Sequence, residues 1–478
     1  MIHRLYNLKG RIRRGKRIGL SFGRRRNFER RKQIMSKIVL IGANHAGTAA
    51  ANTILDNYPE HEVVIIDRNT NISYLGCGTA LWVGRQIDGT DGLFYCSQDV
   101  FEQKHAKVYM ETEVTYIDYT NKKVHARAKD GSEITEGYDK LILATGSLPI
   151  IPKIPGIDLG NVEVVKLFQD GQKINRALDD PNIKNVAVVG AGYIGVEIAE
   201  AVRRRGKNAM LFEMQDTSLA GYYDPWFTHD MDRILGEHGI ELHYSEAVEE
   251  LKGSGDKVQS IRTDKGEYAA ELVILAIGFV PNNALAKDAL KLHTNGAVLV
   301  NLNQESSVPD VYAIGDCATV YSNALRGPAY IALATNAVRS GIVAAHNACG
   351  TALESIGVQG SNGISIYGYN MVSTGLNLKA AEAAGIEVEY TDYQDLQKPA
   401  FIQENQSVKV RIVYEKSSRR IVGAQIASYE DISMGIHMFS LAIEEGVTID
   451  KLKLLDIFFL PHFNQPYNYI TMAALGAK

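Results

Sequence analysis

The chain carries one pattern twice, a strand, a glycine turn, a helix and a second strand, at positions about 150 residues apart. The first copy is KIVLIGANHAGTAAANTILDNYPEHEVVIIDR (Lys37–Arg68), and the second is KNVAVVGAGYIGVEIAEAVRRRGKNAMLFE (Lys184–Glu213). The short apolar runs in both copies are typical of parallel strands that are buried on both faces. A single glycine motif in which one glycine is replaced is weak evidence for nucleotide binding. Two such units in one chain make coincidence a poor explanation. The sequence therefore predicts an α/β fold with two Rossmann-like dinucleotide-binding domains.

The first turn, Gly42 to Gly47, is a G-x-G-x-x-G motif in which Asn44 replaces the middle glycine. Because asparagine tolerates left-handed backbone better than most residues, we expect Asn44 to preserve the tight turn. Backbone amides at the start of the helix should then face a pyrophosphate, and Asp67 should accept a hydrogen bond from a ribose hydroxyl. The cofactor-binding residues predicted from this unit are Gly42, Asn44, His45, Ala46, Gly47 and Asp67.

The second turn has the intact motif, and its second strand ends in Glu213. A carboxylate at this position suits a free 2′-hydroxyl and repels a 2′-phosphate, and Met214, Gln215 and Asp216 supply no cation. NADH is therefore favoured over NADPH. The residues predicted to bind this dinucleotide are Gly190, Gly192, Tyr193, Ile194, Gly195, Glu197 and Glu213.

Two dinucleotide folds in one chain suggest that two dinucleotides meet, one of them a flavin. The segments YDKLILATGSLP (Tyr138–Pro149) and VYAIGDCA (Val311–Ala318) are short apolar strands that end in glycine turns, where a ligand can approach the backbone. A helix is expected within Tyr330–Ala348, with its N-terminus facing the flavin. The residues predicted from these segments are Ala144, Thr145, Gly146, Gly315, Asp316, Ala332 and Leu333.

The net charge of −4 conceals a basic N-terminus, since residues 1–34 hold ten arginines and three lysines against Glu29. That segment has a charge of +12, so the remainder carries −16. A nucleic-acid arm and an organelle presequence are both open readings. We expect instead an extension outside the fold, disordered or preceding a true start at Met35. The acidic body argues against a nucleic-acid partner, and no apolar run approaches the roughly 20 residues that span a membrane.

Four cysteines are spread over the chain without C-x-x-C spacing, which argues against a zinc site, so no metal is expected. This usage favours a reducing, cytoplasmic location. Cys77 stands between Gly76 and Gly78 in SYLGCGTALW. It is open to four interpretations: a packed thiol, half of a redox disulfide, a metal ligand, or a nucleophile that works alone.

Taken together, these motifs resemble the FAD- and NAD-dependent pyridine nucleotide-disulfide oxidoreductase family over nearly all of residues 35–478. The resemblance implies an FAD-binding domain in two parts (35–150 and 277–349), an NAD-binding domain (151–276) and an α+β C-terminal dimerisation domain (350–478). In the family the GD pair, Gly315 and Asp316, contacts the FAD ribityl chain. AIGFVPN (Ala276–Asn282), which includes the predicted contact Gly278, marks the return to the FAD domain. The resemblance also implies a homodimer or homotetramer.

Better-known members of the family carry a second redox cysteine five positions after the first, but position 82 is Trp82. The usual intramolecular disulfide is therefore excluded. What remains resembles the single-cysteine branch, which contains NADH oxidases, NADH peroxidases and coenzyme A-disulfide reductases. In that branch the cysteine, here Cys77, cycles between thiolate and sulfenic acid. Such a thiolate needs a depressed pKa, and His45, which the resemblance places beside Cys77, is expected to orient peroxide or deliver a proton.

The closest similarity within that branch is to water-forming NADH oxidases, which implies that two NADH reduce O₂ to two waters with peroxide as an intermediate. The alternatives are an NADH peroxidase, a coenzyme A-disulfide reductase, and a catalytically slow flavoprotein that acts as a sensor. By the same resemblance Tyr193 gates the nicotinamide pocket, and Glu197, one helical turn on, shares its face. His462 and Phe463 are expected to reach the partner subunit's flavin site, although packing roles are nearly as consistent.

Overall fold

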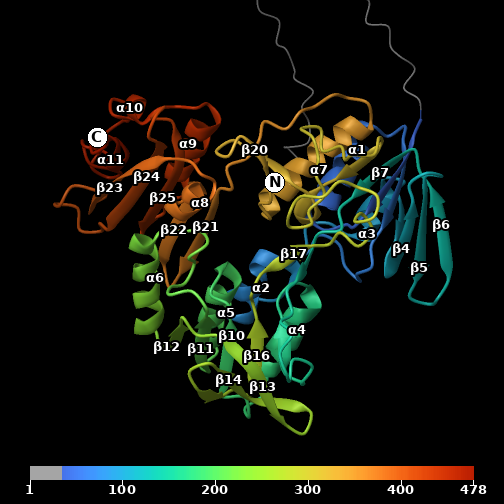
Figure 1. The fold of residues 1–478 in the computed structure, drawn as a ribbon, viewed down its shortest axis with the longest axis horizontal. Coiled ribbons are helices and arrows are strands. Elements are labelled where there is room, and N and C mark those ends of the chain that lie inside the picture. The colour runs from blue at the N-terminus through green and yellow to red at the C-terminus, as the bar shows by residue number, and fades with distance from the viewer. Residues whose placement is uncertain (1–34) are drawn as a thin grey trace, which may run out of the picture.

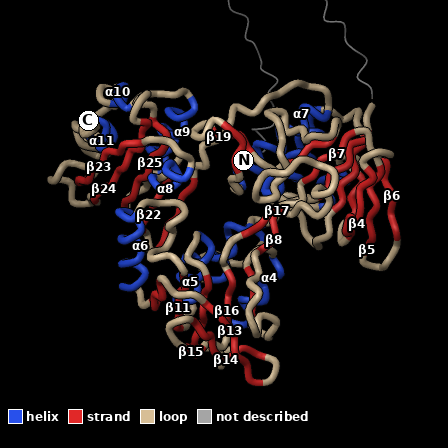
Figure 2. The backbone as a smooth tube through the Cα atoms, viewed as in Figure 1, coloured by secondary structure: helices blue, strands red, loops and turns tan. Residues whose placement is uncertain are grey.

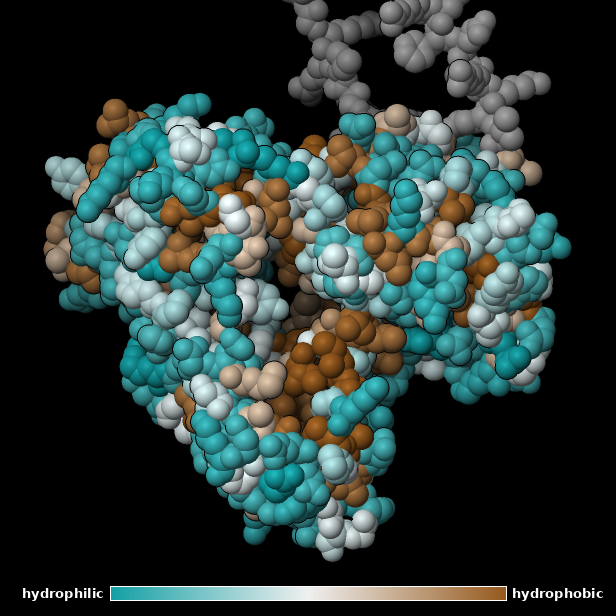
Figure 3. Space-filling model, in the orientation of Figure 1, coloured by the Kyte–Doolittle hydropathy of each residue, from teal (hydrophilic) through white to brown (hydrophobic). Residues whose placement is uncertain are grey.

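The computed structural model describes residues 35–478, and the expectations for residues 1–34 lie outside this range. Three lobes surround a central hollow (Figures 1 and 3). The first lobe is built from the strands around β1, the second from those around β10, and the third from the C-terminal sheet (Figure 2).

The first lobe is a five-stranded parallel sheet in the order β18–β7–β1–β2–β3. In β1, Ile38 and Leu40 pack toward helices, whereas Val39 and Ile41 pack toward an antiparallel sheet on the other face. Because both faces are covered, the strands are continuously apolar, as the sequence predicted. The strands are β1 (Lys37–Ile41), β2 (Glu62–Ile66), β3 (Lys107–Tyr109), β7 (Lys140–Leu143) and β18 (Val311–Ala313).

Two contacting helices, α1 (His45–Asn57) and α7 (Ala334–Ala348), lie on one face of this sheet. The antiparallel sheet on the opposite face comprises β4 (Thr112–Asp118), β5 (Lys123–Ala128) and β6 (Glu133–Gly137). Two shorter helices, α2 (Thr79–Val83) and α3 (Gln98–Gln103), lie between β2 and β3 along the chain. The strand β18 shows that the chain returns to the first sheet after it has built the second.

The second lobe repeats this plan with the parallel order β12–β11–β10–β16–β9. Val186 and Val188 of β10 pack toward helices, and Ala187 and Val189 pack toward an antiparallel sheet. Its elements are β9 (Val162–Val164), α4 (Phe168–Asp179), β10 (Asn185–Val189), α5 (Tyr193–Arg204), β11 (Asn208–Glu213), α6 (Pro225–Glu237), β12 (Ile240–Tyr244), β13 (Val248–Ser254), β14 (Lys257–Thr263), β15 (Glu267–Ala269) and β16 (Leu272–Leu275). The antiparallel pair β8 (Ser147–Pro149) and β17 (Phe279–Pro281) connects the two lobes.

The third lobe is an antiparallel sheet in the order β21–β22–β25–β24–β23, with α9 packed against β22 and β25. Its elements are β21 (Asn362–Ile366), β22 (Tyr369–Gly375), α8 (Leu378–Ala383), β23 (Val388–Leu396), β24 (Ser407–Glu415), β25 (Ile421–Ser428), α9 (Ser433–Glu444), α10 (Ile449–Leu452) and α11 (Tyr469–Leu475). The hairpin β19 (Val320–Ser322) and β20 (Gly327–Ala329) precedes it. The protein thus has the predicted α/β architecture with an α+β C-terminal lobe.

A buried charge network joins the second lobe to the third. Arg411 of β24 donates two hydrogen bonds of 2.7 Å to Asp392, and one of its Nη atoms lies 3.1 Å from Asp224. The Asp224 carboxylate also accepts hydrogen bonds from the Gln425 side chain at 2.7 Å and from the Leu378 amide at 3.0 Å. These bonds satisfy the buried charges and fix the two lobes relative to each other.

Among residues 35–478 no helix is both long and apolar enough to cross a bilayer. The same residues contain no cluster of three or more histidine, cysteine or acidic side chains placed to hold a metal ion.

Candidate active site

The hollow between the lobes is a cavity of about 2180 Å³, and both glycine turns line it (Figure 3). A single-ligand site usually measures about 300–1,000 Å³, so this volume suits two dinucleotides. The cavity brings together all of the predicted cofactor contacts except Gly47 and Gly195.

Gly47 and Gly195 act instead through close packing of the helix against the turn. A Cβ at Gly47 would lie 1.8 Å from the Gly42 carbonyl oxygen, and a Cβ at Gly195 would lie 1.8 Å from the Gly190 oxygen. Both approaches are impossible for a larger residue, so these two glycines let α1 and α5 start directly on their strands.

The first glycine of each turn has a left-handed backbone, with φ +103° at Gly42 and φ +99° at Gly190. The middle position does not. Asn44 has φ −86° and Gly192 has φ −74°, so the expectation that Asn44 relies on left-handed tolerance was wrong. Nothing in the protein lies within 4 Å of a Cβ at Gly192. The backbone conformation at the middle position is therefore accessible to any residue. Gly192 contributes open space in the cavity because it has no side chain.

Asp67, which follows β2, and Glu213, the last residue of β11, stabilise the two glycine turns by hydrogen bonding. Asp67 accepts hydrogen bonds from the amides of Ala43 at 2.6 Å and Asn69 at 2.7 Å. Glu213 accepts from Ala191 at 2.8 Å and Gln215 at 2.9 Å. Both acids also line the cavity, beside the glycine turns, as the ribose-binding prediction requires.

Cys77 lies in a 3₁₀ turn, Gly76–Gly78, immediately before α2, and its side chain is open to the cavity. The surrounding protein nevertheless desolvates the thiol, and this burial raises its pKa, with the negative charges of Glu197 and Asp316 adding to the effect. Lys166 opposes the shift. The predicted depressed pKa of Cys77 was therefore wrong, because burial of the thiol, to which the two acids add, outweighs the opposing charge of Lys166.

His45, the first residue of α1, lines the same cavity. Its Nδ1 lies 2.7 Å from the Tyr95 hydroxyl, and the two rings stack with their centroids 5.8 Å apart. Burial lowers the pKa of His45; Asp316 opposes this shift and Lys166 adds to it. At neutral pH the imidazole is therefore uncharged, and Tyr95 holds its ring in one orientation.

Tyr193 and Glu197 lie on the α5 wall of the cavity. The Tyr193 hydroxyl donates to the Asn362 side-chain oxygen of the third lobe and lies 2.8 Å from the Tyr223 hydroxyl. Burial and the neighbouring Glu200 raise the pKa of Glu197 to about 7.

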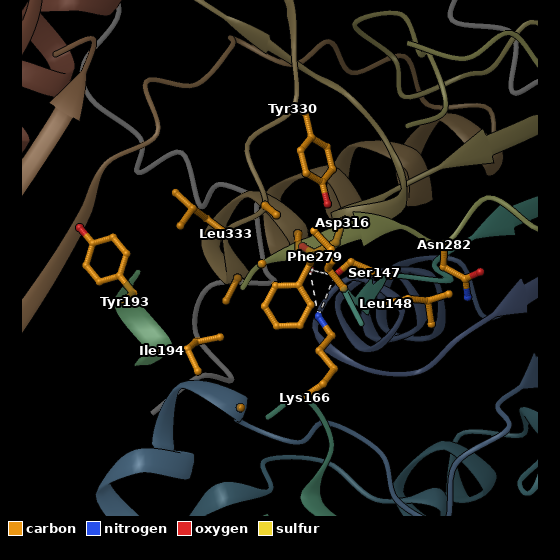
Figure 4. Close-up of a pocket in the computed structure, with 18 of the residues that line it drawn as sticks. Ser147, Leu148, Lys166, Tyr193, Ile194, Phe279, Asn282, Asp316, Tyr330 and Leu333 are labelled. Carbon is orange, nitrogen blue, oxygen red and sulfur yellow. Dashed lines mark hydrogen bonds and ion pairs between the residues drawn. The ribbon is translucent and has the colours of Figure 1, made fainter. Parts of the chain in front are cut away.

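Lys166 is a cavity residue that the sequence reasoning missed. Its Nζ lies 2.8 Å from the Ser147 hydroxyl and 3.3 Å from the Asp316 carboxylate, and 4.5 Å from the centre of the Phe279 ring (Figure 4). Its position just after β9 was the available signal, because ligands in parallel α/β sheets bind outside the carboxyl ends of strands.

His462 and Phe463 do not line the cavity of their own chain. They lie in the loop before α11, where Phe463 is 57% exposed, Phe458 67% and Tyr467 72%. Such a concentration of exposed aromatic side chains is typical of an interaction surface.

Comparison with known proteins matches residues 36–341 to the pyridine nucleotide-disulphide oxidoreductase family and residues 364–468 to the dimerisation domain of that family. The chain belongs to the pyridine nucleotide-disulphide oxidoreductase family. Its sequence is 60% identical to the NADH oxidase of Lactococcus lactis subsp. cremoris, over 92% of this chain and all of that enzyme. It is 59% identical to the NADH oxidase of Streptococcus pyogenes, over 93% of this chain and all of that enzyme.

Its fold is similar to that of the water-forming NADH oxidase from Lactobacillus brevis bound to NADH, with a TM-score of 0.89 and 36% identity over 92% of this chain and 97% of that one. The reduced CoADR-RHD protein of Bacillus anthracis is also similar, with a TM-score of 0.88 and 26% identity over 92% of this chain and 80% of that one. These findings confirm the predicted family and fold class, and with them a flavin, a pyridine nucleotide and oxidoreductase chemistry.

Proposed function

We propose that the protein is an FAD-dependent NADH oxidase that reduces O₂ to water by four electrons through Cys77. The observation that carries this proposal is the position of Cys77. Among the cysteines that the structure describes, it alone lines the cavity onto which both glycine turns open. The NADH oxidases to which the chain is 60% and 59% identical support it.

The first lobe fits the ADP part of FAD. Gly42, Asn44, His45 and Ala46 offer the backbone start of α1 to a pyrophosphate, and Asp67 is placed for a ribose. Gly315 and Asp316 border the same cavity, which supports their contact with the ribityl chain. FAD, when bound, accepts hydride from NADH and supplies the electrons for oxygen reduction.

The second lobe fits NADH through Gly190, Gly192 and Glu213. Gly192 leaves open space at the N-terminus of α5, where a pyrophosphate would lie against backbone amides. The Glu213 carboxylate repels a 2′-phosphate, which supports NADH as the preferred coenzyme. Tyr193, Ile194, Leu333 and Phe279 form apolar walls at the centre of the cavity, where a nicotinamide ring would be shielded from water (Figure 4).

Cys77 removes the peroxide. Its thiolate sulfur attacks one peroxide oxygen, an S–O bond forms, the O–O bond breaks, and hydroxide leaves and takes a proton to become water. The sulfur loses two electrons and becomes a sulfenic acid, and the two electrons of a second NADH restore the thiolate and release the second water. Neutral His45, held by Tyr95, orients the peroxide by hydrogen bonding.

We propose further that the enzyme works as a homodimer or homotetramer through the third lobe. The exposed aromatic side chains around Phe463 support this assembly, in which His462 and Phe463 would reach the partner subunit's flavin site. A cytoplasmic location is supported by four cysteines that are all free thiols. We also propose domain boundaries at residues 150, 276 and 349, which the membership of the strands in the sheets supports.

The deciding experiment is the ratio of NADH to O₂ consumed by purified, FAD-loaded protein, with catalase added at the end. Two NADH per O₂ without oxygen return is expected for the wild type. Cys77→Ser should give one NADH per O₂ and should release oxygen with catalase. Slow oxygen uptake together with fast peroxide-dependent NADH oxidation would instead identify an NADH peroxidase.

A further inference from the structure

A second, smaller cavity of about 340 Å³ lies on another side of Cys77, between α2, α5 and the third lobe. Cys77, Ala80, Glu197 and Gly363 line both this cavity and the large one. The Cys77 and Glu197 side chains are thus part of the wall between the two spaces. The residues that line only the smaller cavity include Glu200, Ser365, Asp431 and Ser433.

The size of the smaller cavity restricts what it can admit. Since a water molecule occupies about 30 Å³ of liquid, the space holds roughly ten waters and is far too small for a dinucleotide. NADH in the large cavity therefore does not compete for this space.

The charge of its wall restricts the occupant further. The wall includes the carboxyl groups of Glu197, Glu200 and Asp431, and it includes no lysine, arginine or histidine. Glu200 is fixed in place, because it accepts hydrogen bonds from Arg204 at 2.8 Å and from the Tyr367 amide at 3.0 Å. The wall offers no cation to a phosphorylated thiol or another anion, whereas small uncharged molecules need none.

We propose that this smaller cavity is a second entrance to Cys77, through which hydrogen peroxide from solvent, in addition to peroxide formed at the flavin, reaches the sulfur and water leaves while a nicotinamide coenzyme occupies the large cavity. The inference rests on the proposed function in one respect, the reaction of Cys77 with peroxide. It adds a route that the coenzyme does not block.

The step at the end of this route is the two-electron oxidation of the Cys77 sulfur. The S–O bond forms as the O–O bond breaks, the peroxide is reduced, and the departing hydroxide takes one proton. Glu197, which borders both cavities, supplies that proton, and the proton consumed in the step is replaced from bulk solvent, which reprotonates Glu197.

The test measures the reaction of Cys77 with added hydrogen peroxide rather than turnover. Reduced, FAD-loaded protein is mixed with peroxide at saturating NAD⁺, and the sulfenic acid is trapped with dimedone and counted by mass spectrometry. Ser365→Trp fills the smaller cavity from the exposed side of β21, and Ser433→Trp fills it independently from α9. Ser365→Ala is the matched control.

With NAD⁺ present, both tryptophan variants are expected to react about 5- to 10-fold more slowly than the wild type and Ser365→Ala, which corresponds to about one to one and a half kcal/mol. Without NAD⁺ all four proteins should react at similar rates through the large cavity. Wild-type rates in both folded tryptophan variants at saturating NAD⁺ would overturn the inference, as would a wild-type reaction that NAD⁺ abolishes.

The outcome is separable from that of the proposed function. A ratio of one NADH per O₂ in Ser365→Ala and the wild type, combined with slow trapping in the tryptophan variants, would refute the water-forming reaction and support the entrance. Two NADH per O₂, combined with wild-type trapping rates in the tryptophan variants, would support the water-forming reaction and refute the entrance.

Discussion

The ammonium group of Lys166 lies 3.3 Å from the carboxylate of Asp316 and so connects the end of β9 in the second lobe to the turn after β18 in the first. Both residues lie at the meeting point of the two dinucleotide folds (Figure 4). The positive charge of Lys166 lowers the pKa of both Cys77 and His45, although burial dominates at each. This cation therefore favours a thiolate beside a neutral imidazole.

Replacing Lys166 with methionine should raise the pKa of Cys77 further. The expected result is an upward displacement, along the pH axis, of the rate of Cys77 alkylation by iodoacetamide. Lys173→Met is the control, because Lys173 is a half-exposed residue of α4 that pairs with Glu163. An unchanged or downward-shifted profile in Lys166→Met would show that its charge does not act on the sulfur.

The half-buried Glu197 should make stability depend on pH. Its pKa is about 7 in the folded protein against 4.5 as the ordinary value, so the folded state holds the proton more tightly. The stabilisation is complete below pH 4.5 and is lost as the pH rises through 7, a difference of roughly 3 kcal/mol. Glu197→Gln should therefore melt several degrees higher than the wild type at pH 8.5 and no higher at pH 4.5.

Differential scanning fluorimetry across that pH range provides the measurement. Glu237→Gln is the control on α6, since Glu237 pairs with Arg233 at the surface with 55% of its side chain exposed. A uniform change in melting temperature at every pH would contradict the assignment of the effect to Glu197 ionisation.

Glu213→Gln should weaken both coenzyme selectivity and the turn itself. The variant loses the charge that repels a 2′-phosphate, so the preference for NADH over NADPH, as a ratio of kcat/KM, should fall about tenfold or more. It also weakens the hydrogen bonds from the amides of Ala191 and Gln215, which should lower the free energy of unfolding by roughly 1–3 kcal/mol. Asp216→Asn, a neighbouring exposed carboxylate, should change neither quantity.

Arg411→Met should destabilise the contact between the second and third lobes. Removal of Arg411 from its buried ion pair leaves the charge of Asp224 uncompensated, which costs about 3–5 kcal/mol. Arg127→Met breaks a surface pair with Glu133 in which both side chains are 61% exposed, and should cost less than about 1 kcal/mol. Equal losses in thermal melts would contradict this ranking. Adding Asp224→Asn to Arg411→Met should restore part of the loss.

The turns of the two nucleotide folds could be predicted because their determinants are local. Gly42 and Gly190 must adopt positive φ, and Gly47 and Gly195 must admit a carbonyl oxygen, and all of these requirements arise within six residues of chain. The prediction that Asn44 tolerates a left-handed backbone was wrong because the positive φ is required at Gly42, the first glycine, and not at the middle position.

The electrostatics of the site could not be predicted in the same way. The pKa of Cys77 depends first on its burial and then on Glu197, Asp316 and Lys166, which are far from it in sequence. The glycines beside Cys77 indicated access to the sulfur but carried no information about the charges around it. Lys166 was missed for a related reason, since its partners Ser147 and Asp316 meet it only after the sheets assemble.

The hydroxyl of Tyr193, at the first position of α5, is anchored on Asn362 of the third lobe. The third lobe, through which we propose that subunits associate, is thereby joined to the helix that follows the second glycine turn. If assembly tightens the hold on Tyr193, NADH affinity must change with protein concentration, and NADH must in turn change the dissociation constant of the oligomer by the same factor. Dilution, which separates the subunits, would then lower or raise the affinity for NADH, as an inhibitor or an activator does in other proteins.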